Sequence, residues 1–241
     1  MNNSLILGAG FPKCGTSSLW VEFRNANIGQ VGEKSQYSCM NVGGSDRVVV
    51  DIGADYISEG RLDKSFLRNN YAQIYIIFCI REPRERITSS IMYHEACGVE
   101  FNVDHEIQRS YYLKYVREFV KDLDGSKVAF VDSTQFENDL DAIFNFFNSE
   151  YQCSGTLYNE SVAKVPLAAK LMILLNRLSQ KTFERTIFSK IFLLNVIKNL
   201  GRPVDKGRSN DIKLDSKIDD SYSYLAARRF GLFGWIDSSE I

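Results

Sequence analysis

The sequence predicts a three-layer α/β fold: a central parallel sheet, a P-loop-like phosphate-binding turn, and a mainly helical C-terminal region. Short apolar or β-branched runs alternate with segments of helical character, which is typical of a parallel sheet covered by helices. The run Gln73–Ile80 contains no polar alternation, as expected of a strand buried on both faces. At 241 residues, the chain fits a single domain.

The predicted elements follow one another in chain order. Five runs predict strands, and they cover Ser4–Gly10, Ile28–Gly32, Arg47–Gly53, Gln73–Ile80 and Lys127–Asp132. Helical patterns cover Thr16–Ala26, Arg84–Cys97, His105–Leu123, Leu140–Phe147 and a series from Val165 to about Leu200. We therefore expect residues 1–160 to form the α/β core and residues 161–241 to form a helical extension of the same domain.

The composition excludes several classes of protein. A formal net charge of −1 argues against a nucleic-acid binder, because phosphate neutralisation requires a basic surface. Five cysteines without C-x-x-C spacing, and only two histidines, give no zinc-site pattern. The predicted strand from Ser4 leaves no room for a signal peptide, and no apolar stretch is long enough to span a bilayer. We expect a cytoplasmic protein with no transmembrane segment.

The first chemical motif is the loop Gly10-Phe11-Pro12-Lys13-Cys14-Gly15-Thr16-Ser17. It follows a predicted strand and opens a predicted helix, where backbone N–H groups and the helix dipole can bind an anion. Hydroxyl groups at residues 16 to 18 can add donors. A nucleoside-triphosphatase loop has lysine directly after the second glycine, whereas here Lys13 stands two residues before Gly15.

The second motif is an arginine-rich stretch that begins at Arg81, directly after the strand predicted over Gln73–Ile80. Ligands of open α/β sheets bind beyond the carboxyl ends of the strands, so Arg81 should face the same crevice as the first loop. Arg86, Ser89 and Ser90 have helical spacing and share one face of the predicted helix. Guanidinium and serine groups are suitable donors to phosphate.

Together, these two stretches resemble the PAPS-dependent sulfotransferases of the carbohydrate and heparan type, where PAPS is 3′-phosphoadenosine 5′-phosphosulfate. The first is similar to their 5′-phosphosulfate loop, Pro-Lys-x-Gly-Thr-Ser/Thr. The second is similar to their 3′-phosphate motif, Arg-x-Pro-x-x-Arg-x-x-Ser. The resemblance implies that Lys13 contacts the oxygen bridging phosphorus and sulfur, and that Arg81 and Ser89 hold the 3′-phosphate. The implied PAPS-binding residues are Pro12, Lys13, Cys14, Gly15, Thr16, Ser17, Ser18, Arg81 and Ser89.

The resemblance also implies a reaction: transfer of the sulfuryl group to a hydroxyl, or less readily an amine, of a carbohydrate or glycolipid, without a metal. Many carbohydrate-type members carry a glutamate in a Lys-Glu-x-x-Phe/Tyr segment, but here the order Glu33-Lys34 is reversed. Glu33 is the first candidate for the catalytic base. His94, one helical turn beyond Ser90, is the second. Lys13 completes the set of candidate catalytic residues.

Residues 161–209 form a basic arm, in which ten Lys and Arg residues stand against only Glu184 and Asp205. Such a pattern is typical of solvated helix faces. It also fits contact with an anionic glycan, a phosphate or a membrane surface, so peripheral membrane contact through this arm stays open.

Two other functions also stay open. Val48-Val49-Val50-Asp51 imitates the strand that supports Mg²⁺ in P-loop kinases, and would fit a Mg-ATP-dependent small-molecule kinase. The reversed Glu33-Lys34 pair fits a catalytically silent PAPS-binding protein.

Overall fold

The computed structural model describes residues 3–33, 37–40, 48–59, 62–97, 102–155 and 214–241. The chain divides into two compact units. The first contains Met1–Pro83, Gln108–Tyr158 and Leu214–Ile241, and the second contains Arg84–Ile107 and Asn159–Lys213. The whole basic arm, residues 161–209, and the helices predicted from Val165 to about Leu200 lie outside the described residues.

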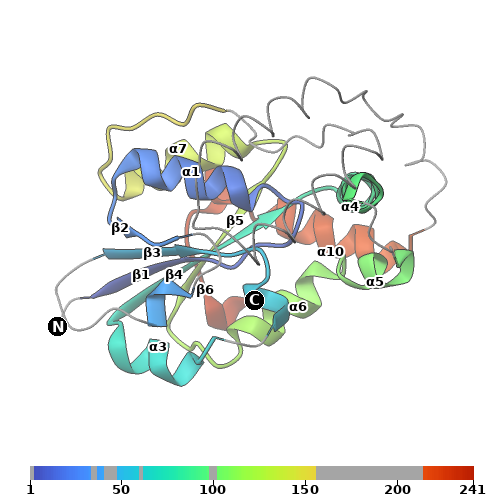
Figure 1. The fold of residues 1–241 in the computed structure, drawn as a ribbon. Coiled ribbons are helices and arrows are strands. Elements are labelled where there is room, and N and C mark those ends of the chain that lie inside the picture. The colour runs from blue at the N-terminus through green and yellow to red at the C-terminus, as the bar shows by residue number, and fades with distance from the viewer. Residues whose placement is uncertain (1–2, 34–36, 41–47, 60–61, 98–101, 156–213) are drawn as a thin grey trace, which may run out of the picture. The chain divides into compact units, whose positions relative to one another are not determined.

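The first unit is built on a six-stranded mixed sheet of strand order β2-β3-β1-β4-β5-β6 (Figure 1). The strands are β1 Ser4–Gly8, β2 Gln30–Val31, β3 Val48–Ile52, β4 Gln73–Ile80, β5 Lys127–Asp132 and β6 Ile236–Asp237. Strands β1 to β5 pair in parallel, whereas β6 pairs antiparallel to β5. The α/β class and the five predicted strands are confirmed, but the sheet is not wholly parallel.

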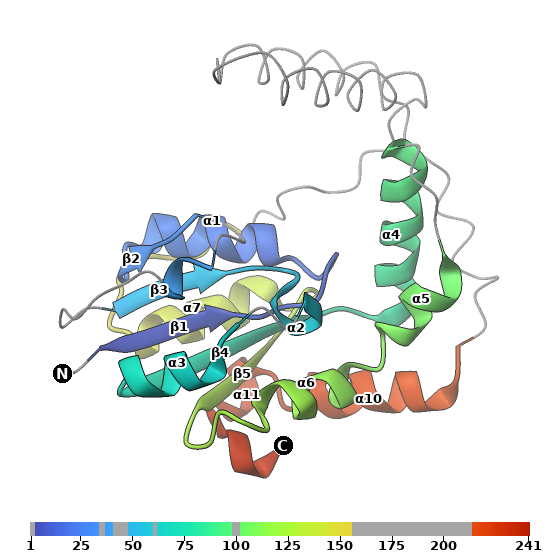
Figure 2. The same cartoon turned by 60° about the horizontal axis from the view of Figure 1, so that its bottom comes forward.

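Helices cover both faces of this sheet, with α1 and α7 on one face and α3, α6 and α10 on the other (Figure 2). The helices of the unit are α1 Thr16–Ala26, α2 Tyr56–Glu59, α3 Lys64–Asn70, α6 Tyr112–Val120, α7 Phe136–Phe146, α10 Ser216–Ala226 and α11 Phe230–Phe233. Short 3-10 turns occur at Ser38–Met40 and Ser238–Glu240. Strands β1 and β4 form the centre of the core, since Leu5 to Leu7 and Ile76 to Ile80 are fully buried. Their apolar runs therefore match a strand covered on both sides.

The C-terminal residues contribute more to the sheet unit than the sequence predicts. Helix α10, helix α11 and strand β6 all belong to it. Strand β6 has only two residues, and it is held by the ion pair between Lys127 and Asp237, whose Nζ and Oδ1 lie 2.7 Å apart. A strand this short gives no periodic signal, so it was not predicted.

Two helix predictions have the wrong bounds. The helix predicted over His105–Leu123 is two helices, α5 Val103–Gln108 and α6. In the first turn of α6, the Leu113 N–H donates to Ser221 Oγ at 2.8 Å, which satisfies one of the free N–H groups of a helix start. Helix α7 begins four residues before the predicted Leu140, after a turn in which Thr134 N–H donates to Asp132 Oδ1 at 2.9 Å. Both starts depend on contacts with side chains rather than on apolar spacing.

The described part of the second unit consists mainly of α4 Pro83–Cys97, whose first residue belongs to the first unit, and most of α5. Arg86 is fully buried there, and its Nη1 lies 2.9 Å from Glu106 Oε2. A second guanidinium nitrogen donates to the Glu106 carbonyl. A buried arginine is tolerated only with such partners, so this pair fixes α4 against α5.

Candidate anion-binding site

The loop from Gly10 to Gly15 joins the carboxyl end of β1 to the first turn of α1. Lys13 adopts a left-handed backbone conformation with φ 67°, and Gly15 does the same with φ 102°. A left-handed lysine is uncommon, and such strain is concentrated at ligand-binding turns. Gly15 is the N-cap of α1 and has no side chain to cap the helix, so the first turn of α1 begins without a side-chain cap. Backbone N–H groups at such a helix start are able to bind an anion.

Close packing explains why the loop carries glycine at both ends. A Cβ on Gly10 would lie 2.4 Å from Thr16 Cγ2 and 3.3 Å from both Cβ and N of Cys79. Gly10 therefore lets the loop approach β4 and the start of α1. A Cβ on Gly15 would meet only the Phe136 ring, at 3.6 Å, so Gly15 is required by its φ rather than by space.

The side chains of the loop and of the first α1 turn differ in how deeply they are buried. Cys14, Thr16 and Ser18 are buried, whereas Pro12, Lys13 and Ser17 are half-buried. Burial holds Cys14 and Ser18 in place within the core. The partial exposure of Lys13 and Ser17 leaves a cation and a hydroxyl at the loop surface, which is what recognition of a charged ligand needs.

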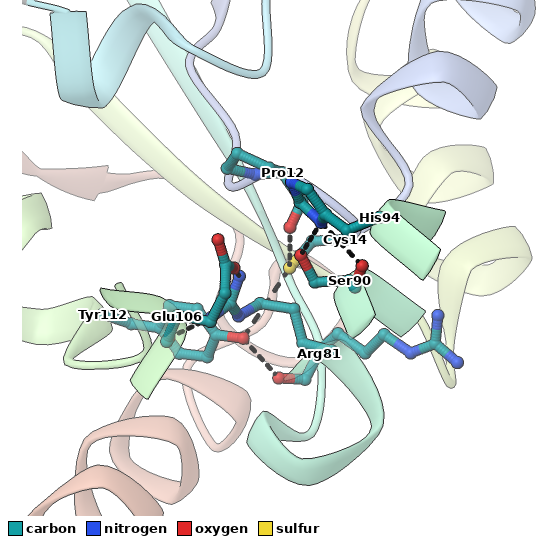
Figure 3. A network of polar contacts seen from close by, with 8 residues as sticks. Pro12, Cys14, Arg81, Ser90, His94, Glu106 and Tyr112 are labelled. Atoms are coloured by element: carbon teal, nitrogen blue, oxygen red, sulfur yellow. Dashed lines mark hydrogen bonds and ion pairs between the residues drawn. The ribbon is translucent and has the colours of Figure 1, made fainter. Parts of the chain in front are cut away.

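Tyr112 connects this loop to the second motif (Figure 3). Its hydroxyl donates to the Arg81 backbone oxygen at 2.8 Å and lies 3.7 Å from Cys14 Sγ. Cys14 Sγ itself donates to the Pro12 carbonyl at 3.8 Å, within the loop. The Tyr112 ring is buried, and its centroid lies 4.5 Å from that of Phe11. One side chain thus fixes both the loop and the backbone at the end of β4.

Arg81 stands directly beyond β4 and is half-buried. Strand β4 pairs with β1 in parallel, and Ala9 N–H donates to the Ile77 carbonyl at 3.1 Å beyond the end of β1. The loop and Arg81 therefore lie at the same edge of the sheet, where ligands of open α/β sheets bind. The strand pairing thus places Arg81, the first residue of the second motif, at the edge of the sheet where the loop lies.

A cavity of about 270 Å³ opens at the start of α7, beyond the carboxyl end of β5. Its lining consists of Ser133, Thr134, Gln135, Phe136, Glu137, Asn138 and Gly155. Because Phe136 also approaches Gly15, the cavity lies beside the loop. Sequence reasoning missed these residues, although their position directly after a predicted parallel strand was a usable signal.

The other predicted residues of the second motif lie on α4, in the second unit. Ser89 and Ser90 are both buried there. His94 is half-buried, and its Nδ1 lies 2.8 Å from the Ser90 carbonyl oxygen. Since a carbonyl can only accept, Nδ1 carries a proton, and Nε2 is the basic nitrogen of the neutral ring.

The structure places the two predicted acidic residues in opposite environments. Glu33 is exposed and follows β2, whereas Asp51 is fully buried in β3. Asp51 accepts the Cys39 N–H at 2.8 Å and the Tyr56 hydroxyl at 2.6 Å. Burial next to this carboxylate raises the pKa of Tyr56. Asp51 therefore stabilises the turn after β3.

Comparison with known proteins gives no family. Neither a scan against protein-family models nor a search of the curated proteins returns a match for this chain. Of the helices in the described part of the chain, none has the length and apolar character needed to cross a bilayer. The described residues also contain no group of three or more His, Cys, Asp or Glu side chains arranged to hold a metal ion.

Proposed function

We propose that this protein binds PAPS and transfers its sulfuryl group to an acceptor hydroxyl, as a sulfotransferase. The observation that carries the proposal is the β1–α1 loop, with a left-handed Lys13 and an uncapped helix start at Gly15. Its link through Tyr112 to Arg81 supports the proposal further, because PAPS requires separate sites for its 5′ and 3′ anionic groups.

In the proposed reaction, the acceptor oxygen attacks sulfur in line with the bond between sulfur and the bridging oxygen. A new S–O bond forms to the acceptor while the bond to the bridging oxygen breaks. The acceptor proton passes to a base, and adenosine 3′,5′-bisphosphate leaves with the negative charge. Lys13 and the loop amides would stabilise that charge, which develops mainly in the transition state.

Glu33 and His94 are the two candidate bases. Glu33 is exposed, and would need the acceptor itself to exclude water from its carboxylate. His94 has an oriented ring whose Nε2 can accept a proton. The variants Glu33→Gln and His94→Gln distinguish them: loss of the base lowers turnover by the 10²- to 10⁴-fold typical of general base catalysis, and leaves bisphosphate affinity unchanged.

The binding roles are tested by three substitutions. Lys13→Ala should mainly lower turnover, because its contact strengthens as the leaving group departs. Arg81→Ala and Ser89→Ala should each weaken bisphosphate affinity by roughly 1.5–3 kcal/mol, the range for hydrogen bonds to charged groups. Titration calorimetry measures the affinities. If neither Arg81→Ala nor Ser89→Ala changes the affinity for the bisphosphate, the 3′-phosphate site is removed from the proposal.

The kinase alternative depends on Asp51 as a support for Mg²⁺. That carboxylate already accepts two hydrogen bonds and is fully buried, so its geometry favours a structural role over magnesium support. We therefore prefer sulfuryl transfer. A catalytically silent PAPS-binding protein would differ from a sulfotransferase only in turnover. It would bind the bisphosphate but would transfer no sulfuryl group to any member of a library of acceptors.

A further inference from the structure

The turn between β5 and α7 contacts both motifs of the candidate anion-binding site. Its Ser133 N–H donates at 2.9 Å to the carbonyl of Ile80, the last residue of β4, which directly precedes Arg81. Phe136, the first residue of α7, is buried, and its ring would lie 3.6 Å from a Cβ placed on Gly15. This turn therefore supports the end of β4 and the first turn of α1 at the same time.

Asp132, the last residue of β5, closes this turn. Its Oδ1 accepts hydrogen bonds from the N–H and the hydroxyl of Thr134, both at 2.9 Å, and its backbone carbonyl accepts from the Gln135 N–H at 2.9 Å. An aspartate that accepts from the backbone two residues further on fixes the shape of the turn that follows it. Asp132 is 3% exposed, so water has little access to replace these contacts.

The second carboxylate oxygen of Asp132 is held from the C-terminal part of the chain. Tyr222 of α10 donates its hydroxyl to Asp132 Oδ2 at 2.8 Å. Helices α10 and α7 cover opposite faces of the sheet, so this hydrogen bond joins the two layers at the end of β5 (Figure 2). Because a buried carboxylate requires donors, the Tyr222 hydroxyl fixes the orientation of the group that closes the turn.

Asp139 of α7 holds the same residue through its backbone. Its Oδ2 accepts the Asp132 N–H at 3.1 Å. Its Oδ1 accepts the Gly231 N–H at 3.0 Å and lies 2.6 Å from Arg229 Nη1. Tyr222, Arg229 and Gly231 all follow the α/β core in sequence, so the C-terminal part of the chain supplies donors to both carboxylates that fix the β5–α7 turn.

We propose that Tyr222 is a positioning residue of the anion-binding site, which acts through Asp132 and the β5–α7 turn on Gly15 and Arg81. The role requires no contact between Tyr222 and the ligand. Donors to an anion bind tightly only where the surrounding structure holds them in place, so a looser turn costs affinity. This role rests on the proposed function, because it concerns the ligand of the same site.

The test is titration calorimetry of the full chain with adenosine 3′,5′-bisphosphate. Tyr222→Phe removes the hydroxyl that donates to Asp132 and keeps the ring, and we expect it to weaken binding by about 2- to 12-fold. Tyr224→Phe is the matched control, because Tyr224 lies on the same helix and is also half-buried. Its hydroxyl makes no hydrogen bond to any residue in the described part of the chain. We expect this control to bind within about 2-fold of wild type.

Substitutions of Asp132 test the route by which Tyr222 acts. Asp132→Asn keeps an oxygen for Thr134 and offers an amide group to the Tyr222 hydroxyl, whereas Asp132→Ala removes both contacts. We expect Asp132→Ala to lose at least as much affinity as Tyr222→Phe, and Asp132→Asn to retain more. Adding Tyr222→Phe to Asp132→Ala should cause no further loss, because the hydroxyl then has no carboxylate to orient. A further loss of full size would overturn the route.

Urea denaturation of the same variants separates positioning from stability. Lower stability of Tyr222→Phe with wild-type affinity for the bisphosphate would overturn the proposal, and so would an equal loss of affinity in Tyr224→Phe. Where Asp132→Ala fails to fold, the comparison of Tyr222→Phe with Tyr224→Phe decides the proposal by itself.

Failure of the sulfotransferase function gives a different result. If the wild-type chain binds ATP with Mg²⁺ in place of the bisphosphate, sulfuryl transfer is refuted, and the same variants are titrated with ATP. A loss of ATP affinity in Tyr222→Phe alone then supports the positioning role, and wild-type affinity overturns it. Absence of binding of either nucleotide to the wild-type chain would refute both the function and the positioning role.

Discussion

Substitution of Tyr112 by phenylalanine tests whether one hydroxyl coordinates the two motifs of the candidate site. The substitution removes only the oxygen that donates to the Arg81 carbonyl and lies 3.7 Å from Cys14 Sγ. The ring remains, so its packing against Phe11 is preserved. The effect therefore reports the polar contacts rather than a cavity.

Both the stability and the affinity changes can be worked out from the structure. A neutral hydrogen bond contributes about 0.5–1.5 kcal/mol net, and a buried acceptor left without its partner costs about 1–3 kcal/mol. Arg81 is half-buried, so water can replace part of the lost donor. We therefore expect a loss of about 1–2 kcal/mol in the free energy of unfolding. If the hydrogen bond also positions the ligand groups, bisphosphate affinity falls by about 2- to 12-fold.

The assays are urea denaturation for stability and titration calorimetry with adenosine 3′,5′-bisphosphate for affinity. Tyr115→Phe is the matched control, because the Tyr115 ring also faces Phe11, at 6.4 Å between centroids. Its hydroxyl makes no hydrogen bond to any residue that the structure describes. Lower stability in Tyr112→Phe with wild-type affinity would refute a positioning role, and leave Tyr112 a purely structural residue.

Three further predictions concern stability. Arg229→Ala should cost about 3–5 kcal/mol in urea denaturation, because it leaves the fully buried Asp139 carboxylate without the guanidinium 2.6 Å away; a loss below 1 kcal/mol would contradict this. Gly10→Ala should cost about 1–3 kcal/mol and weaken bisphosphate binding, because its Cβ would lie 2.4 Å from a Thr16 methyl; wild-type behaviour in both assays would show that the loop adjusts freely. Burial raises the pKa of the Cys153 thiol from 9.0 to about 12, so between these pH values the folded state holds a proton that the unfolded chain has lost. Stability should fall there by at most about 1.4 kcal/mol per pH unit from this group, and Cys153→Ala should lessen the fall; an unchanged alkaline slope would contradict the assignment.

The sheet could be predicted largely because its strands are buried on both faces. Strand β4 runs over Gln73–Ile80 and β5 over Lys127–Asp132, as their uninterrupted apolar patterns predict. Helix α1 begins at Thr16, directly after Gly15, as predicted. Strand β6 could not be predicted, because it exists only through pairing with β5 and has no pattern of its own.

The candidate site was predictable only in part. The positions of the β1–α1 loop and of Arg81 follow from the predicted strands and from the rule that parallel strands end at one edge. Tyr112 was missed because an aromatic residue at a helix start is ordinary, and its role depends on two partners distant in sequence. Asp51 was considered as a magnesium support because it ends the run Val48-Val49-Val50-Asp51. Its hydrogen bonds from Cys39 and Tyr56 depend on tertiary contacts that the sequence pattern does not show.

The central claim is tested most directly by calorimetric titration of the full chain with adenosine 3′,5′-bisphosphate, compared with ATP in the presence and absence of Mg²⁺. Sulfuryl transfer predicts that the bisphosphate binds more tightly than ATP and that its affinity does not depend on the metal. Preference for ATP with Mg²⁺ would contradict the sulfotransferase proposal and favour a kinase.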